Sequence, residues 1–209
     1  MLIAGRLKPF TVTGYVTGVA DPEAPLEYHK LTKSDAMTMF FALRENSENL
    51  ATMFEWGLDA ADYSLATVQR YCEHNSNDSS QQDFIFFSNG QFVGQGAVLP
   101  HRDEPSQRQL GIWVDKKLQG RGFGTKMVEI LESETFSNRE VEALFYLHDS
   151  GNKASAGVAE KSNFFHHCDF EQPIKTPFES GSWKCLVKTR DLFELLSARE
   201  VFPGRLVND

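Results

Sequence analysis

The stretch "GIWVDKKLQGRGFGTKMVEI", residues 111–130, places three glycines at alternate positions, Gly120, Gly122 and Gly124. An apolar run precedes them, and Phe123 and Met127 then recur at the spacing of an amphipathic helix. A strand that opens directly into a helix leaves the first amide N–H groups of that helix unpaired, and their partial positive charge favours an anion. Glycines let the anion approach closely. The stretch therefore predicts an anion-binding turn, with a tight turn that holds no ligand as the alternative.

The spacing of the glycines separates the known phosphate-binding patterns. A P-loop needs Gly-Lys-Ser/Thr, whereas Gly124 is followed by Thr125 and then Lys126. The dinucleotide pattern G-x-G-x-x-G fails because Thr125 or Met127 stands where the last glycine belongs. The pattern present is Q-x-x-G-x-G, which begins at Gln119.

Upstream of the glycines, the pattern predicts one strand, three helical stretches and a loop. A short strand is expected at residues 28–31, followed by a helix with Ser34 as its N-cap. A second helical stretch surrounds residues 50–56, and a third begins near residue 64. The polar residues 75–82 then predict a loop.

The clearest hairpin joins "DFIFF" and "QFVGQGAVL" across "SNG", where Asn89 and Gly90 suit a tight turn. Gly94 and Gly96 inside the second run indicate a bulge or a close approach of two backbones. Further strands are expected at residues 109–114, at 143–148 and at "WKCLVK", with helices at 155–164 and at 191–199, the last capped by Asp191. The order β-α-α-α-β-β-β-α-β-α-β-α predicts an α/β fold with a mixed sheet covered by helices.

Composition narrows the class of protein. The chain has 209 residues, 41% of them hydrophobic, which is enough for one sizeable core. A formal charge of -8 argues against a nucleic-acid binder and suits a basic substrate or simple solubility. Cys72, Cys168 and Cys185 show neither disulfide nor zinc spacing, and no secretory leader or membrane-length apolar run is present. We expect a soluble cytoplasmic protein.

A second motif gives the glycine pattern its context. "NKASAGVAEKSNF", residues 152–164, follows the glycine helix after one strand. With "QLGIWVDKKLQGRGFGTKMVEILES", it resembles the GNAT superfamily of acyl-CoA-dependent N-acetyltransferases, most closely the branch of the RimJ and RimL ribosomal-protein N-terminal acetyltransferases. The resemblance extends over residues 28–188. It implies a mostly antiparallel central sheet with a splayed acyl-CoA-binding strand pair, and we divide the chain into an extension (1–27), a GNAT domain (28–190) and a C-terminal helix and tail (191–209).

The resemblance implies acetyl-CoA as donor, with its pyrophosphate on the amides of residues 119–125 and its pantetheine arm along the strand at 112–114. Arg121 and Lys126 then supplement the phosphate site or are solvated charges. Asn152 and Ser155 match the N-x-x-S of the family, with helix capping as the alternative. The expected cofactor-binding residues are Ile112, Trp113, Val114, Gln119, Gly120, Arg121, Gly122, Phe123, Gly124, Thr125, Asn152 and Ser155.

Direct attack of a neutral amine on the thioester is the reaction that the family implies, with no covalent enzyme intermediate and with a backbone N–H of Ile112 or Trp113 polarising the carbonyl. Many members have Glu where this chain has Gln109, and many have Tyr where it has Ala159. In a second alignment, "FFHHCDF" brings a phenylalanine, residue 165, to that tyrosine position. The expected catalytic residues are therefore His148, Asp149, Tyr146 and Ser155.

Neighbouring His166 and His167, with Cys168, suggest a metal site, but adjacent residues on a helix point apart, so no metal is expected. The acceptor is expected at residues 54–62 and 101–107, where acidic side chains either attract a cationic amine or form a solvated face; they are Glu55, Asp59 and Asp62.

The leading acceptor is a protein N-terminus, and a polyamine or aminoglycoside is the runner-up. The rivals are a degenerate acyl-CoA-binding module and a nucleotide-binding domain that uses the glycines for ATP or NAD. The expected partners are acetyl-CoA and an amine, without nucleic acid or membrane, in a monomer or homodimer.

Overall fold

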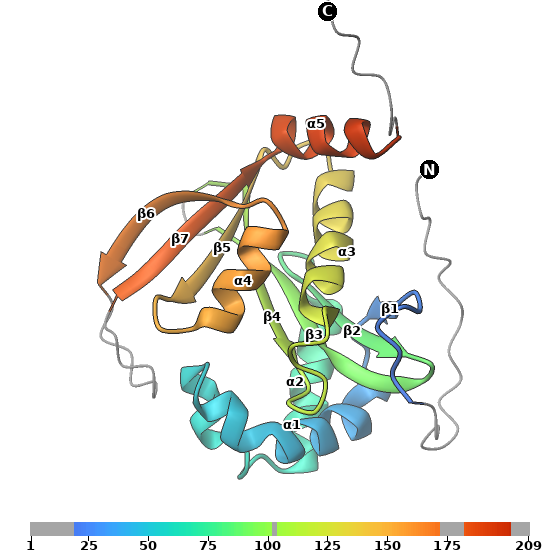
Figure 1. Ribbon diagram of the computed structural model, residues 1–209. Helices are drawn as coiled ribbons and strands as arrows, with labels where there is room; N and C mark the ends of the chain where they lie inside the picture. The colour runs from blue at the N-terminus through green and yellow to red at the C-terminus, as the bar shows by residue number, and fades with distance from the viewer. Residues whose placement is uncertain (1–18, 102–103, 172–181, 202–209) are drawn as a thin grey trace, which may run out of the picture.

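The computed structural model describes residues 19–101, 104–171 and 182–201. A seven-stranded sheet of order β1-β2-β3-β4-β5-β7-β6 runs through the molecule, and every neighbouring pair is antiparallel except β4 and β5 (Figure 1). The mixed α/β prediction is confirmed. The strands are β1 (Glu27–Lys30), β2 (Gln82–Ser88), β3 (Gln91–Pro100), β4 (Gln107–Val114), β5 (Ala143–Asp149), β6 (Phe165–Glu171) and β7 (Ser182–Thr189). The α-helices are α1 (Ala36–Ala51), α2 (Leu65–Asn77), α3 (Phe123–Ser137), α4 (Lys153–Lys161) and α5 (Arg190–Val201), and the 3-10 helices are η1 (Lys33–Asp35) and η2 (Glu55–Asp59).

Strand alternation gives the sheet two different apolar faces. On β2, Phe84 and Phe86 point into the cluster that buries α3. Ile85 and Phe87 point the other way, into the cluster formed with α1 and α2. The helices thus form a layer on each side of β2, β3 and β4, with α3 and α4 together on one side and α1 and α2 on the other (Figure 1).

The β2–β3 hairpin has the predicted turn, with Asn89 at φ 50° and Gly90 at φ 75°. A register shift lies between Phe86 and Phe87, as the glycines of β3 suggested. A Cβ on Gly94 would lie 2.2 Å from the carbonyl oxygen of Trp113, so only glycine allows β3 and β4 to approach here.

The first helices differ from the prediction. Ser34 is not an N-cap but lies inside η1, whose N-cap is Thr32. The backbone N–H of Thr32 donates to the Asp35 carboxylate at 2.7 Å, so the capped turn is η1, and α1 begins at Ala36. The helix expected around residues 50–56 is the end of α1 followed by η2, because no strong breaker interrupts the chain before residue 51. Ser64 does cap α2, accepting from the Thr67 N–H at 3.1 Å, but α2 extends into the predicted loop as far as Asn77.

Strand β6 was missed entirely. All but one of its residues are exposed, so the sequence shows no alternation there. His166 and His167 therefore lie on an edge strand and not on a helix. The described residues contain no group of three His, Cys, Asp or Glu side chains that could hold a metal. Helix α4 ends at Lys161, before the predicted residue 164, and Asn163 takes a left-handed φ of 55° beyond it.

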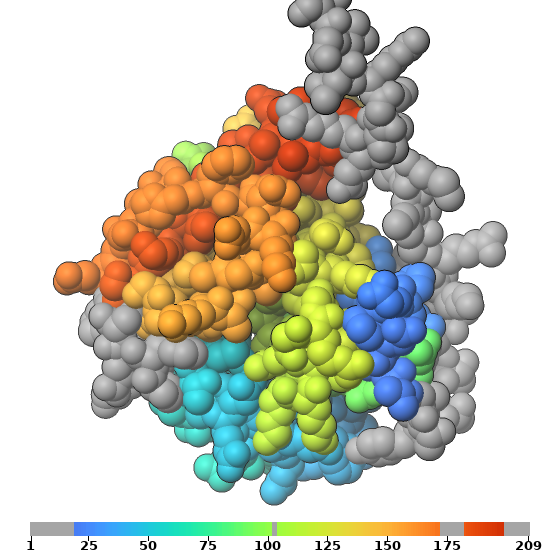
Figure 2. All heavy atoms as spheres, in the orientation of Figure 1, coloured from blue at the N-terminus to red at the C-terminus, as the bar shows by residue number. Residues whose placement is uncertain are grey.

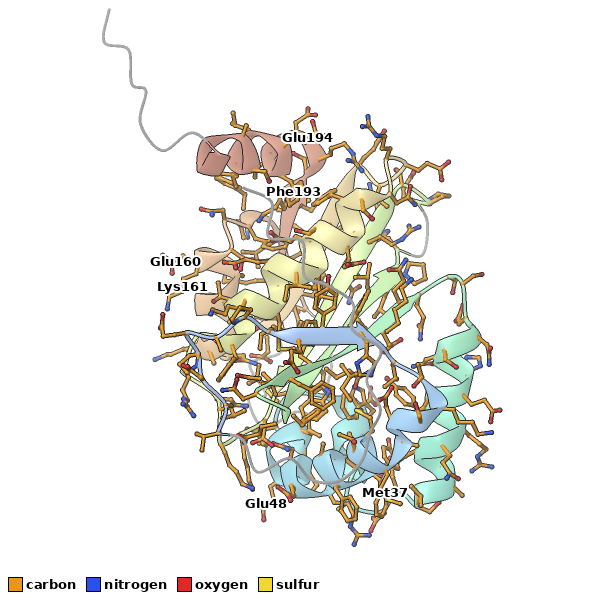
Figure 3. The ribbon with its side chains drawn as sticks, turned by 90° about the vertical axis from the view of Figure 1, so that its right-hand side faces the viewer. Met37, Glu48, Glu160, Lys161, Phe193 and Glu194 are labelled. Carbon is orange, nitrogen blue, oxygen red and sulfur yellow. The ribbon has the colours of Figure 1, made fainter. Side chains whose placement is uncertain are left out.

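The C-terminal helix begins one residue before Asp191, which lies in its first turn and is not its cap. Phe193 of α5 points toward α3, where its ring stacks on Phe136 with centroids 4.8 Å apart (Figure 3). None of the helices among the described residues has the length and apolarity to cross a bilayer.

Residues 19–26, which the sequence assigns to an extension, pack against the domain. Ala20 and Leu26 are buried in the same core as α3. The Ala20 N–H donates to Gln91 Oε1 at 2.8 Å, and the Asp21 N–H donates to Ser88 Oγ at 3.0 Å. This segment is therefore anchored to the end of the β2–β3 hairpin.

Candidate functional site

The parallel pairing of β4 and β5 stops halfway along both strands. It runs from Gln107 opposite Ala143 to Leu110 opposite Tyr146. Beyond that point β4 remains paired with β3 as far as Val114, and β5 remains paired with β7 as far as Asp149. The two strands therefore diverge, and the edge of β4 from residue 111 to 114 faces a gap. An extended ligand can bind such an edge as an added strand.

A cavity of about 1110 Å³ occupies this gap. Its lining extends from Met39 of α1 and Tyr71 of α2, past β4, to Gly122 before α3 and Ser155 on α4. In the space-filling view, the yellow-green glycine segment meets orange α4 and the cyan α1–α2 region on one face of the molecule (Figure 2). The volume slightly exceeds the usual range of small-molecule sites, about 300–1,000 Å³, so two ligands can meet inside.

The glycines before α3 have separate roles. Gly120 and Gly122 have left-handed φ values of 74° and 88°, and no atom lies within 4 Å of a Cβ added to either. They make the turn and leave the first amides of α3 open to an anion. A Cβ on Gly124 would lie 3.1 Å from Val158 Cγ2, so this glycine allows α3 and α4 to pack closely. The anion site predicted from the sequence fits the first two glycines best.

Basic side chains near the turn are directed elsewhere. Arg121 Nη2 donates to the carbonyl of Ala20 at 3.1 Å, and Lys126 Nζ donates to the carbonyl of Pro22. Phe123 is buried in the core. The predicted cofactor-binding residues that line the cavity are Ile112, Trp113, Val114, Gln119, Gly120, Gly122, Gly124, Thr125, Asn152 and Ser155, whereas Arg121 and Phe123 do not.

Tyr146 of β5 and Ser155 of α4 come together at the border of the gap. The Tyr146 hydroxyl lies 2.8 Å from Ser155 Oγ. Burial raises the pKa of Tyr146, against a smaller opposing effect of the Ser155 hydrogen bond, so the phenol keeps its proton at neutral pH. Asn152 Oδ1 accepts the Ser155 N–H at 3.0 Å, so Asn152 is a helix cap that also lines the cavity.

His148 and Asp149, consecutive on β5, point to opposite faces of the sheet. His148 lies on the same face as Tyr146, and its Nδ1 is 2.8 Å from the carbonyl oxygen of Asp149, which requires a proton on Nδ1. Asp149 lies on the α1–α2 face, where its Oδ1 accepts the Gly151 N–H at 2.7 Å. Both are buried residues that line the cavity.

Gln109 and Ala159 are the two positions at which the sequence departs from the family pattern. Gln109 lines the cavity on the α1–α2 face. Ala159 is fully buried in the core, where a tyrosine ring has no room. Tyr146 therefore brings a hydroxyl into the gap from β5 instead of from α4.

Sequence reasoning missed a buried polar network on the α1–α2 face. Asp83 Oδ1 accepts from Gln95 Nε2 at 2.9 Å and from the Tyr71 hydroxyl at 3.1 Å, and Gln81 Nε2 donates to Asp83 Oδ2 at 3.0 Å. Trp113 Nε1 donates to Gln95 Oε1 at 3.2 Å, which links the network to β4. The alternation of the strands could have revealed this network, since it places Asp83 and Gln95 at inward positions of β2 and β3.

The expected acceptor loops contribute unevenly. Phe54 and Trp56 stack with centroids 5.0 Å apart and line the cavity. Within 101–107, residues 102–103 lie outside the described part, and none of the others lines the cavity. The acidic residues Glu55, Asp59 and Asp62 are exposed and do not line it.

Comparison with known families identifies residues 26–164, about two thirds of the chain, as matching the profile described as "Acetyltransferase (GNAT) domain". No curated protein sequence gives a significant match. Among solved structures, RimL, a ribosomal alpha-N-protein acetyltransferase in complex with coenzyme A, has a TM-score of 0.73 at 14% identity, over 84% of this chain and 99% of that one. RimJ of Mycobacterium smegmatis, in complex with CoA-disulfide, has a TM-score of 0.69 at 14% identity, over 83% and 88%. AAC(6')-Ib in complex with ribostamycin and coenzyme A has a TM-score of 0.67 at 22% identity, over 82% and 97%.

Proposed function

The chain belongs to the GNAT acetyltransferase family, and from this premise we propose that it transfers acetyl from acetyl-CoA directly to a primary amine. The observation that carries the proposal is the divergence of β4 and β5 after Leu110 and Tyr146. The gap joins an anion-binding turn on one side of the sheet to an apolar chamber on the other, so a thioester and an amine can meet between the strands.

The donor half fits a long, phosphorylated ligand. The open amides that follow Gly120 and Gly122 suit a pyrophosphate, and the unpaired edge of β4 from residue 111 to 114 suits the amide groups of a pantetheine arm. When bound, acetyl-CoA supplies the activated acetyl group. A backbone N–H of Ile112 or Trp113 is the proposed donor to the thioester carbonyl.

Proton transfers are assigned to groups on β5. Tyr146, held by Ser155 and kept protonated by burial, is the proposed acid for the departing thiolate. Asp149 faces the α1–α2 side, from which the amine approaches, and is the first candidate for the base, directly or through water. His148 Nε2 is the second candidate, since Nδ1 is already committed to the Asp149 carbonyl.

The proposed reaction has two candidate acceptors. A protein N-terminal α-amine leads, supported by the similarity to RimL and RimJ, and the cytoplasm is the location proposed with it. A polyamine or an aminoglycoside-like amine is the second candidate, favoured by the buried carboxylate of Asp83 in the chamber and in keeping with the ribostamycin complex of AAC(6')-Ib.

The test is a thermal-shift titration with CoA, ATP and NAD, followed by a thiol-release assay against N-terminal peptides, spermidine and aminoglycosides. We expect CoA alone to raise the melting temperature, and at least one amine to release thiol from acetyl-CoA. A shift with ATP or NAD but not with CoA contradicts the proposed donor. CoA binding without thiol release from any amine instead favours an acyl-CoA-binding sensor.

A further inference from the structure

We propose that Asp83 binds a second positive charge of a small-molecule acceptor, so that among small amines the preferred substrate is a diamine or polyamine with one ammonium at Asp83 and one neutral amine in the gap. This inference rests on the proposed acetyl transfer and concerns the α1–α2 half of the same cavity.

Asp83 is a buried carboxylate, 4% exposed, that lines the cavity. Every group that donates to it is neutral: the amides of Gln81 and Gln95, the hydroxyl of Tyr71 and the amide of Asn75. Within the part of the chain that the structure describes, no Lys, Arg or His lies within ion-pair distance of Asp83. A buried carboxylate without a cation is unfavourable, and burial raises its pKa above the usual value. A ligand that brings a cation would relieve this cost.

The chamber around Asp83 suits the carbon chain of such a ligand. Its walls are mainly apolar and aromatic and include Met39, Met53, Phe54 and Trp56. Apolar walls with a few convergent polar groups are typical of sites for small molecules. Methylene groups would pack against these side chains, while the carboxylate takes the charge.

The sheet register gives the distance between the backbone of Asp83 and the backbone of β4 at the gap. Asp83 is opposite Ala97 on β3, and Ala97 is opposite Gly111, the first residue of β4 beyond the β4–β5 pairing. Two strand spacings separate Asp83 from Gly111, or about 10 Å. Subtracting a charge-assisted hydrogen bond of about 2.8 Å leaves a separation on the order of 6–7 Å between the two nitrogens of the acceptor. An extended four-carbon diamine spans this distance.

The hydrogen-bond network holds the carboxylate in place for this role. Gln95 donates to Asp83 and accepts from Trp113, so the anchor is tied to the strand that borders the gap. Tyr71 fixes the same carboxylate oxygen from α2. Gln95 of β3 and Tyr71 of α2 thus hold Asp83 directly, and Gln95 links it to β4.

The test compares 1,4-diaminobutane with butylamine, which has the same carbon chain and one amine fewer, in the full chain with acetyl-CoA. The wild type is expected to use the diamine at least tenfold better in kcat/KM. Equal use of the two amines by the wild type would overturn the proposal without any variant.

The matched variants are Asp83→Asn and, as control, Asp191→Asn, which removes the same charge from an exposed position on α5, outside the cavity. Asp83→Asn keeps the volume and an acceptor for Tyr71 and Gln95, and Gln81 can turn its amide to accept. We expect it to lower kcat/KM for the diamine ten- to a hundredfold, mainly through KM, and to change butylamine less than twofold. The control should change neither. An equal loss for both amines, or a loss confined to kcat with an altered pH profile, contradicts an anchor and indicates a structural or base role.

A binding measurement separates this inference from the proposed reaction. With CoA present, 1,4-diaminobutane should raise the melting temperature of the wild type and of Asp191→Asn, but not of Asp83→Asn. This result would support the anchor even if no amine released thiol, which would defeat the proposed reaction alone. The same shift in all three proteins would overturn the anchor while leaving acetyl transfer intact.

Discussion

The Tyr146 hydroxyl lies 2.8 Å from Ser155 Oγ, and this contact joins β5 to the first turn of α4 at the border of the gap. It places a buried phenol at the border of the gap, where the proposed reaction needs an acid for the departing thiolate. Under this proposal, Tyr146 supplies from β5 the hydroxyl that the family resemblance leads one to expect at the position of Ala159.

Tyr146→Phe is expected to lower kcat on the order of a hundredfold, since a positioned general acid contributes about 10²- to 10⁴-fold. The raised pKa of Tyr146 keeps the phenol protonated through neutral and mildly alkaline pH, so its ionisation should not reduce the wild-type rate there. Thiol-release kinetics measure the effect. Tyr28→Phe is the control, because the Tyr28 hydroxyl bonds Glu134 far from the gap. Full activity of Tyr146→Phe would remove this tyrosine from the mechanism.

Asp149→Asn should reduce kcat/KM on the order of a hundredfold at neutral pH, because it removes the proposed general base. His148→Gln should have the smaller effect, because His148 points to the face of Tyr146 and away from the α1–α2 chamber. The measurement is kcat/KM at neutral pH for both variants. If His148→Gln loses more activity than Asp149→Asn, the two assignments are reversed.

Gly122→Ala should weaken CoA binding at least tenfold and cost about 1–2 kcal/mol of stability, since a Cβ at φ 88° strains the backbone. Gly90→Ala carries the same strain at φ 75° in the β2–β3 turn, away from the cavity. It should lose similar stability and keep its CoA affinity. Calorimetric titration with CoA and thermal unfolding separate the two effects, and equal CoA affinities would place the pyrophosphate elsewhere.

Lys188→Met should destabilise the fold by about 3–5 kcal/mol, because it removes the 2.6 Å ion pair of the buried Glu132 carboxylate. Lys33→Met breaks the exposed pair with Glu73 and should cost at most about 1 kcal/mol. Urea unfolding measures both. Adding Glu132→Leu to Lys188→Met should restore most of the loss, and a small effect of Lys188→Met alone would show that Glu132 is neutral in the fold.

Asp35→Asn should reduce stability at pH 7 by about 1–3 kcal/mol, and the difference should shrink in acid. Burial alone raises the pKa of Asp35, but hydrogen bonds from His29 and from the Thr32 side chain and backbone outweigh it and lower the pKa. A depressed folded pKa stabilises the fold above the unfolded value, about 3.9, and this stabilisation is lost as the pH falls through the folded value. Unfolding free energies between pH 3 and pH 7 test this, with Asp62→Asn as an exposed control. A difference that does not vary with pH would contradict it.

The sequence predicted the parts of the fold that periodicity and turn chemistry determine. The β2–β3 hairpin, β4 and α3 all lie where alternation, Asn89-Gly90 and the spacing of Phe123 and Met127 placed them. Strand β6 escaped because an exposed edge strand need not alternate. Ser34 was misplaced because Thr32 and Asp35, three residues apart, cap the entry to α1 together.

For the site, the glycines predicted the turn, but their different roles depend on distances to α4 that sequence spacing does not contain. Asp83 was overlooked because its significance comes from having only neutral donors around it in the folded chain. Arg121 was expected at the phosphate, yet its partner is a backbone carbonyl 101 residues away in sequence, which no local pattern reveals.

That backbone carbonyl belongs to Ala20. Removing it together with the carbonyl groups of Pro22 and Ala24 would change the surroundings of the glycine turn. A protein cut to begin at residue 28 would lose the carbonyl groups that hold Arg121 and Lys126, together with the buried side chains of Ala20 and Leu26. Two cations beside the glycine turn would then be released, and the electrostatic potential at that turn would become more positive. The glycine turn is the proposed donor site, so kinetics measured on such a shortened protein would report on an altered turn. The eight residues from 19 to 26 should therefore be kept in any protein that is assayed.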